Sequence, residues 1–410
     1  MIRKVGINNY KSIPALTLDL GRITVLIGAN GSGKSNILEA IALGSAAAQS
    51  KLDNEFLISR GIRVTATRFM RAAFRDHPPP PKAIKIAFRK GEEPTIGMVK
   101  KLGKSIIISV RGDDGVAFDT ELSADQTASY PKWKWTSSYP NWRQFVPIST
   151  RDLINALEAT HRPPDTEVTE EFFRGTISQI AEGLRSRSAG TLLEFLVYCP
   201  ENSALRTFQS EGQILPLGIR GEGLFAHLKA LDTDKNRPRL VRIKETLKLI
   251  DWFESFDIPD DLSPGGRTIR IRDRYLPESA RFDQRSANEG FLFLLFYVTL
   301  LTSPDTPAFF SIDNVENCLN PKLCVALLQQ IVILAKEYDK QVILTTHSPA
   351  VLDGLDLTDD EQRLLVVERN KAGHTRVRRV DPPKPSARQV PVSLSEAFMR
   401  GYIGGLPKNF

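Results

Sequence analysis

The chain has 410 residues, 41% of them hydrophobic and 25% charged, with a net charge of +7. This composition is typical of a globular protein, and the length predicts two or three domains or lobes. No stretch approaches the roughly 18 uninterrupted apolar residues of a membrane span, and the N-terminus lacks a secretory signal, so no membrane partner is expected. Three scattered cysteines without metal-ligand spacing favour reduced thiols in the cytoplasm. The positive charge permits a nucleic-acid partner without establishing one.

The residues from Gly28 to Ser35 fit the P-loop pattern G-x-x-x-x-G-K-[ST]. An apolar run at 23–27 predicts a strand before them, and helical spacing at 36–43 predicts a helix after them. In such a loop the backbone faces phosphate oxygens, Lys34 reaches the β- and γ-phosphates, and Ser35 ligates Mg²⁺. A glycine-rich turn that binds nothing is the alternative, and the strand–loop–helix context argues against it. We therefore predict ATP and Mg²⁺ as cofactors, with nucleotide contacts from Gly28, Asn30, Gly31, Ser32, Gly33, Lys34, Ser35 and Asn36.

Residues 1–135 are expected to form the N-terminal part of a nucleotide-binding lobe. Paired strands are predicted at 2–7 and 16–20, on either side of Tyr10-Lys11-Ser12. Tyr10 lies either near the nucleotide base or in a turn, and we favour the turn. Alternating patterns at 83–88 and 106–110 predict strands that extend the sheet, with a turn at 113–115.

Residues 136–260 are expected to be a mostly helical insertion. Helices are predicted at 152–159 and 170–187, and a buried strand at 193–198. The absence of a long heptad run argues against an extended coiled coil. A basic segment at 237–248 is either a solvated helix face, which is the default interpretation, or a stripe that faces DNA.

Residues 261–360 are expected to complete the nucleotide-binding domain, and 361–410 to form a hairpin and a tail. Apolar strands are predicted at 309–312 and 341–345, with helices from Gly290 and over 323–336. Asp313 follows the first of these strands, which is expected to lie beside the P-loop strand, and Asp313 is therefore the candidate Mg²⁺ ligand beside Ser35. His347 follows the second strand and is placed near the γ-phosphate.

These motifs together resemble an ABC-type ATPase of the SMC, RecF and OLD clade, in particular its compact prokaryotic AAA family ATPases. Residues 313–321 resemble the Walker B stretch, 346–349 the switch-histidine loop, 10–12 the opening of the family, and 395–407 its C-terminal ending. The resemblance implies an α/β fold: a P-loop NTPase with an ABC-type nucleotide-binding domain and an inserted helical lobe. It also implies head-to-tail homodimers with ATP held between the two chains. The loop that caps the partner's ATP would be 286–290, with Ser286, Asn288 and Gly290 as contacts; Ser286 and Asn288 are both candidates for the polar contact.

The main departure from the family is Asn314, which stands where a glutamate usually activates water. An amide can orient water but cannot deprotonate it. Glu316 is a candidate substitute, so the catalytic candidates are Asp313, Asn314, Glu316 and His347. We expect a slow ATPase, or a protein that uses ATP mainly to hold an interface.

The resemblance implies work on or with DNA or RNA, in DNA repair or antiphage defence. In systems such as Septu and PARIS, similar ATPases scaffold a separately encoded nuclease. This chain shows no nuclease motif, and about 60 residues after the switch loop are too few for a Toprim domain, so a partner nuclease is expected. A scaffold that binds ATP without hydrolysis is the rival function. A transporter ATPase is disfavoured because the loop at 286–290 fits the S-G-G-Q pattern poorly, and the arrangement of Asp313 and His347 disfavours a kinase.

Overall fold

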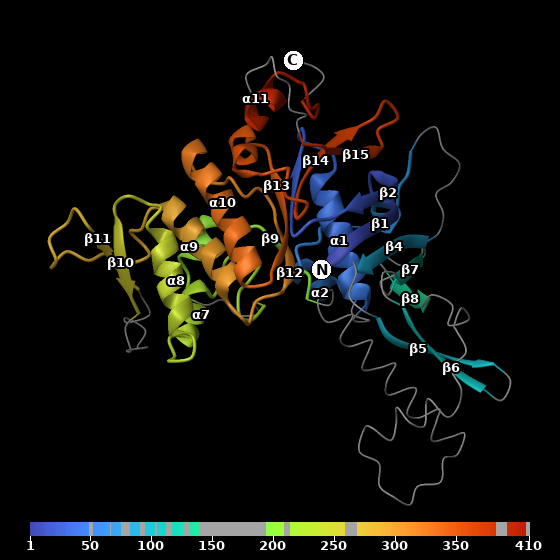
Figure 1. Ribbon diagram of the computed structural model, residues 1–410, viewed down its shortest axis with the longest axis horizontal. Helices are drawn as coiled ribbons and strands as arrows, with labels where there is room; N and C mark the ends of the chain where they lie inside the picture. Colours follow the sequence, from blue (N-terminus) through green and yellow to red (C-terminus); the bar gives the residue numbers. More distant parts are fainter. Residues whose placement is uncertain are drawn as a thin grey trace, which may run out of the picture.

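The computed structural model describes residues 1–48, 52–65, 67–74, 83–90, 95–102, 105–111, 117–125, 132–138, 194–208, 214–258, 269–382 and 392–406. The helices expected at 152–159 and 170–187 and the turn expected at 113–115 lie outside these residues. Figure 1 shows a mixed α/β protein in which strands from both ends of the chain lie in the middle.

The centre of the molecule is a six-stranded sheet in the order β15-β14-β3-β13-β12-β9. Its strands are parallel except for the antiparallel pair β14–β15. They span β3 (Ile23–Ile27), β9 (Val197–Tyr198), β12 (Phe309–Ile312), β13 (Gln341–Thr346), β14 (Gln362–Arg369) and β15 (Thr375–Val380). Every residue of β3 is buried, because both faces of a parallel sheet are covered. Ile23, Val25 and Ile27 face one core and Leu26 the other, as the alternation of a strand requires.

One expectation about this sheet was wrong: β12, which ends before Asp313, does not lie beside β3. β13 pairs with both and separates them. After β12 the chain crosses over through α10 (Pro321–Glu337) and returns into the central position. The order of strands along the chain does not reveal this, since a crossover can insert the next strand on either side.

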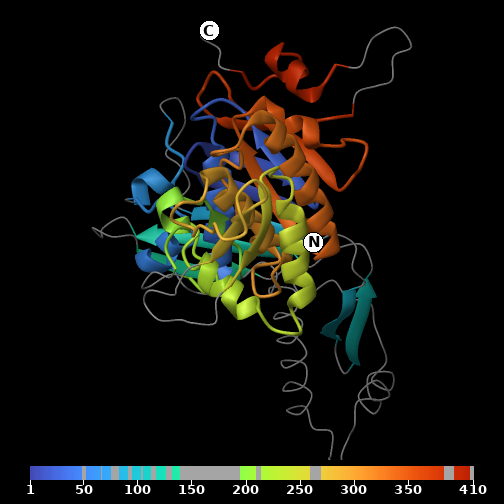
Figure 2. The same ribbon diagram turned by 90° about the vertical axis from the view of Figure 1, so that its left-hand side faces the viewer.

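Helices cover the two faces of the central sheet unequally. α1 (Lys34–Ala48) packs on one face together with a second, antiparallel sheet in the order β2-β1-β4-β7-β8. On the other face lie α10, α8 (Arg237–Leu247) and α9 (Glu289–Thr302), as Figures 1 and 2 show. α9 is buried at every position from 290 to 302, as expected for a helix that is apolar all round.

The remaining elements include two separate two-stranded sheets, β5–β6 and β10–β11. In chain order, the remaining elements are β1 (Ile2–Tyr10), β2 (Ile13–Asp19), α2 (Asn54–Ser59), α3 (Thr67–Met70), β4 (Ala83–Lys90), β5 (Thr95–Leu102), β6 (Ser105–Arg111), β7 (Ala117–Asp125), β8 (Lys132–Ser138), α6 (Asn202–Leu205), α7 (Leu224–Leu231), β10 (Phe253–Asp257), β11 (Arg270–Asp273), the 3-10 helix η1 (Pro349–Gly354) and α11 (Leu394–Met399). None of the helices among the described residues is long and apolar enough to cross a membrane.

The sequence predicts most of these elements correctly. The strands expected at 2–7 and 16–20 pair as β1 and β2, and the C-terminal hairpin is β14–β15. Two local expectations were wrong. The strand expected at 193–198 forms ladder pairs only at Val197 and Tyr198. Tyr10 is a core residue at the end of β1 and fully buried, so its ring is neither a turn aromatic nor a surface on which a base could stack.

Candidate nucleotide site

The P-loop joins β3 to the first turn of α1, as its sequence predicts. Lys34 is the first residue of α1 and is only 5% exposed. Its Nζ donates to the carbonyl oxygens of Gly28 (2.7 Å) and Ala29 (3.1 Å). Burial lowers the pKa of Lys34 from 10.5 to about 8, although Asp313 and Glu316 favour its charged form. Phosphate oxygens in the loop would give this cation charged acceptors.

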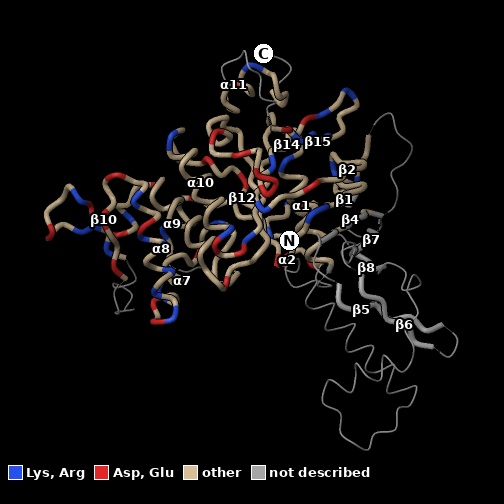
Figure 3. The backbone as a smooth tube through the Cα atoms, in the orientation of Figure 1, with Lys and Arg blue, Asp and Glu red and all other residues tan. Residues whose placement is uncertain are grey.

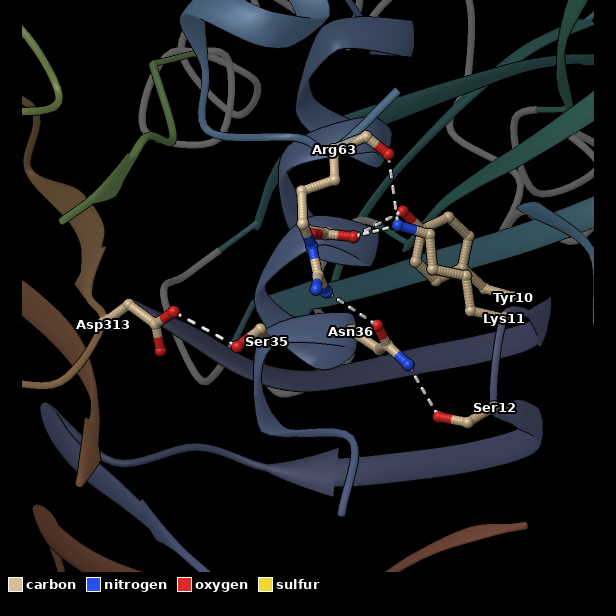
Figure 4. A network of polar contacts seen from close by, with 8 residues as sticks. Tyr10, Lys11, Ser12, Ser35, Asn36, Arg63 and Asp313 are labelled. Carbon is tan, nitrogen blue, oxygen red and sulfur yellow. Dashed lines mark hydrogen bonds and ion pairs between the residues drawn. The ribbon is translucent and has the colours of Figure 1, made fainter. Parts of the chain in front are cut away.

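Ser35 and Asp313 are in contact. This is so although β13 separates β3, which precedes the P-loop, from β12, which ends before Asp313. The Ser35 hydroxyl donates to Asp313 Oδ2 at 3.2 Å, which Figure 4 shows. The Thr345 hydroxyl, from β13, donates to Asp313 Oδ1, and the N–H of Asn314 donates to Thr345 Oγ1 at 2.9 Å. These hydroxyl and carboxylate oxygens are the ligand type that Mg²⁺ prefers. The role of Thr345 at the site was not predicted, because a threonine inside an apolar run is typical of an ordinary strand.

Glu316 and His347 lie beside the P-loop, at the end of the site where nucleotide phosphates would bind. The backbone N–H of His347 donates to Glu316 Oε1 at 2.7 Å, and His347 Nδ1 lies 3.5 Å from Lys34 Nζ. Desolvation and the Lys34 cation lower the pKa of His347 and favour its neutral form. Asn314 has a φ of +54°, in the left-handed region that asparagine tolerates better than most residues. The structure therefore gathers Asp313, Asn314, Glu316 and His347 at the P-loop.

Two buried polar atoms at this end have no hydrogen-bond partner among the described residues. They are Ser32 Oγ in the loop and Glu316 Oε2 opposite it. Buried polar groups are rarely left unpaired, so these atoms mark a place where a polar ligand or water belongs. The residues present therefore fit a nucleotide phosphate with its metal ion.

The loop expected to cap a partner's nucleotide lies at the start of α9. Asn288 is the N-cap of this helix, because its Oδ1 accepts the N–H of Phe291 at 3.3 Å, and Gly290 lies in the first turn. The N–H of Ser286 donates to the carbonyl of Asp283. Within the described part of one chain, no hydrogen bond joins these three residues to the P-loop, and α9 lies on the opposite face of the sheet from α1 (Figure 1).

The side chain of Arg206, directly after α6, holds this loop through hydrogen bonds. Its guanidinium donates to the carbonyls of Gln284 (2.7 Å), Arg285 (2.7 Å) and Ala287 (2.9 Å). Asn202 on the same helix donates to Glu289 Oε1 at 2.5 Å. This role could not be predicted from the sequence, since a single arginine some 80 residues upstream matches no motif.

Thr375, in the C-terminal half of the chain, also holds the P-loop and was not predicted from the sequence. The Thr375 hydroxyl, from β15, donates to the carbonyl of Ser32 at 2.9 Å and lies 2.6 Å from Ser12 Oγ. Asn36 donates to the same Ser12 hydroxyl at 2.8 Å (Figure 4). A methyl group at Gly33 would lie 2.2 Å from Thr375 Oγ1, so the loop can pass this close only with glycine there.

A cavity of about 450 Å³ opens beside Ser12 and Asn36. Behind it, the carboxylate of Glu39 is almost fully buried and binds Tyr10, Lys11 and Arg63. The walls combine cations with aromatic rings: Lys11, Ser12, Asn36, Arg63, Thr65, Phe69, Arg71, Ala73, Phe74 and Arg369. Aromatic rings and guanidinium planes suit the stacking of a nucleobase, and the cations suit phosphates.

Comparison with known proteins agrees with this geometry. A family model described as an AAA ATPase domain matches residues 1–69, and a second, described as an AAA domain provisionally assigned to the AbiEii toxin of type IV TA systems, matches residues 201–353. The SMC head bound to the C-terminal winged-helix domain of ScpA superposes with a TM-score of 0.52 at 14% identity, over 93% of this chain and 98% of that one. The chain therefore has the fold of an SMC head, and two of its segments match AAA ATPase domain models.

Two further similar structures are SMC heads. One, derived from Pyrococcus furiosus and bound to the C-terminal domain of ScpA, has a TM-score of 0.49 at 13% identity over 93% of this chain and 96% of that one. The SMC head from Thermotoga maritima has a TM-score of 0.43 at 14% identity over 93% and 99%. No curated protein matches the sequence of this ATPase head.

Proposed function

We propose that this ATPase head is an ATP-dependent switch that dimerises head to tail and acts with nucleic acid and a separately encoded nuclease. The observation that carries the proposal is the 3.2 Å contact between Ser35 and Asp313 beside the buried Lys34. Lys34 and the loop backbone would hold the phosphates of ATP, and Ser35 and Asp313 would hold Mg²⁺. The metal ion, when bound, neutralises charge on the β- and γ-phosphates.

Dimerisation is proposed because the described residues of one chain do not bring the P-loop together with the loop expected to cap the nucleotide. The P-loop leads into α1 on one face of the sheet, and α9, which Asn288 caps, lies on the other face (Figure 1). The positive end of a buried helix is a suitable partner for the γ-phosphate of a second chain. Arg206 holds the preceding loop in a fixed shape, which supports a role in binding.

This arrangement suits the regulation of a partner protein better than rapid hydrolysis of ATP. Asn314 replaces the usual catalytic glutamate, and Glu316 binds the switch loop at His347. Two SMC heads of the same fold are bound to ScpA domains, and one matching family description names a toxin. We therefore propose a held ATP state that restrains or recruits an effector, in antiphage defence, with DNA repair as the alternative. The cytoplasm remains the proposed location.

The test is the mass of the protein in solution with and without Mg²⁺-ATP, measured by light scattering, together with steady-state hydrolysis. We expect ATP to convert monomers to dimers in wild type and not in Lys34→Ala. Dimers without measurable hydrolysis would favour the non-hydrolysing scaffold. No nucleotide binding by the wild-type protein would contradict the proposal.

A further inference from the structure

The segment 392–406, which we call the tail, is anchored beside the switch loop. Its helix α11 is capped by Ser393, whose hydroxyl accepts the N–H of Glu396 at 3.2 Å. Ser395 donates to the carboxylate of Asp353 twice, through its N–H (2.9 Å) and its hydroxyl (2.6 Å). Asp353 belongs to η1, which begins at Pro349 immediately beyond His347 and Ser348. One end of the tail is therefore tied to the element that continues the switch loop.

The other end of the tail lies against the first glycine of the P-loop. A methyl group at Gly405 would lie 2.8 Å from Val366 Cγ1 and 3.6 Å from Gly28 Cα. On its other side Gly28 meets β14, since a methyl group there would lie 2.0 Å from the carbonyl oxygen of Val367. Gly28 is therefore enclosed between β14 and the tail.

The tail is held in this place by packing as well as by hydrogen bonds. Arg378 of β15 donates to the carbonyl of Ile403, and Ile403 and Leu406 pack against the main core. Figure 1 shows the tail above the sheet, beside β14 and β15. Met399 and Tyr402, by contrast, are 63% and 67% exposed. The tail thus has one face fixed on the nucleotide site and one face in solvent.

We propose that the tail is a positioning element that couples the P-loop at Gly28 to the switch loop at His347, so that a docked tail raises the affinity for ATP. This rests on the proposed ATP binding. Coupling between two sites is reciprocal, so ATP must also stabilise the docked tail by the same factor. A tail with only a structural role would not respond to ATP.

Two glycines of the tail provide a matched test. Gly405 and Gly401 both have a positive φ, +85° and +75°, so replacement by alanine strains both backbones alike. A methyl group at Gly401 meets only Leu406 Cδ1 at 3.8 Å, whereas at Gly405 it clashes with Val366 of β14 at 2.8 Å and crowds Phe398 of α11 at 3.1 Å, which displaces the tail from Gly28. We expect Gly405→Ala to weaken ATP binding about fivefold or more, within the usual range of coupling between sites. Gly401→Ala should stay within about twofold of wild type, as for most exposed substitutions.

Hydrogen exchange of the tail tests the reciprocal effect without straining the backbone. ATP should slow amide exchange at 394–406 in wild type, and should not do so in Lys34→Ala. Ser395→Ala removes the hydroxyl contact to Asp353 and should reduce both the ATP affinity and the slowing. If wild type does not bind ATP at all, the proposed function fails. The coupling is wrong if wild type binds ATP, both glycine variants bind it equally well, and ATP does not change hydrogen exchange in the tail. The assignment of the nucleotide site would then be unaffected.

Discussion

The hydroxyl of Thr375 donates a 2.9 Å hydrogen bond to the carbonyl of Ser32, inside the P-loop, across 343 residues of sequence. The same hydroxyl lies 2.6 Å from Ser12 Oγ, which accepts from Asn36 at the start of α1. The phosphate loop is therefore shaped by the β1–β2 turn on one side and by β15 on the other. A loop that is fixed before the nucleotide arrives loses less entropy on binding it.

Removing this hydroxyl should weaken nucleotide binding. Thr375→Val keeps the shape of the side chain but leaves the buried carbonyl of Ser32 without its donor and the Ser12 hydroxyl without an acceptor, a penalty of about 1–3 kcal/mol. We expect an affinity for ATP about fivefold lower or worse, measured by calorimetry. Thr375→Ser keeps the hydroxyl and is the matched control, expected to stay within about twofold. Equal affinities for the two variants would show that the contact does not shape the loop.

The sequence predicted the parts of the candidate site that lie directly after a strand. The P-loop, Asp313 and His347 each follow a recognisable strand, so their positions could be inferred from local pattern alone. Thr375, Thr345 and Arg206 could not be inferred, because each acts through contacts with residues far away in the sequence and matches no motif. The same limit explains the error over β12: local pattern identifies a strand, but tertiary packing decides its neighbours.

Lys34 should make ATP binding depend on pH. Burial lowers the pKa of this lysine to about 8, so the free protein carries the cation below that pH and loses it above. Because phosphate binds the charged form, affinity should be constant below about pH 8 and fall by about tenfold between pH 7 and pH 9. Lys34→Ala should fold, lose at least several-fold in affinity, and retain no such pH dependence. Calorimetry at the two pH values measures this, and unchanged affinity in folded Lys34→Ala would remove the P-loop assignment.

Arg206 should affect ATP-induced dimerisation and not the binding of ATP by a single chain. Arg206→Ala removes three hydrogen bonds to the loop before α9 and should lower the free energy of unfolding by about 1–2 kcal/mol. ATP-induced dimerisation should weaken because that loop loses its shape. The ATP affinity of monomers should remain near that of wild type. Analytical ultracentrifugation across a range of protein concentrations separates the two effects, and an equal loss of both would place Arg206 in the general fold instead.

Binding of DNA or RNA, if it occurs, should be electrostatic and independent of sequence. The basic segment at 237–248 motivates this prediction, as does a second one at 267–274, of which the structure describes all but the first two residues. Cations outnumber carboxylates along α8, whereas β10 and β11 carry both (Figure 3); Arg242 pairs with Glu337, and Arg272 pairs with Glu254. We therefore expect weak binding that falls steeply as salt rises. Fluorescence anisotropy from 50 to about 200 mM salt tests this; binding that ignores salt would contradict it.

The rate of hydrolysis should depend on which carboxylate reaches the attacking water. Asp313 is occupied by Ser35 and Thr345, and Asn314 has no carboxylate, so only Glu316 remains as a base in the Walker B stretch. Glu316 Oε1 accepts the N–H of His347, but its buried Oε2 has no partner among the described residues. If Glu316 orients the switch loop and does nothing more, wild type should hydrolyse ATP slowly and hold the dimer.

Restoring a carboxylate at position 314 tests this directly. Asn314→Glu matches the usual family residue, but a glutamate at φ +54° costs about 1 kcal/mol, whereas Asn314→Asp tolerates the left-handed backbone. A positioned base contributes about a hundredfold or more in rate, so we expect either variant to hydrolyse ATP about tenfold faster or more and to shorten the life of the dimer. Glu316→Gln is the paired variant. Brisk hydrolysis by wild type that Glu316→Gln abolishes would make Glu316 the base and end the scaffold alternative. If neither position changes the rate, the catalytic water lies elsewhere.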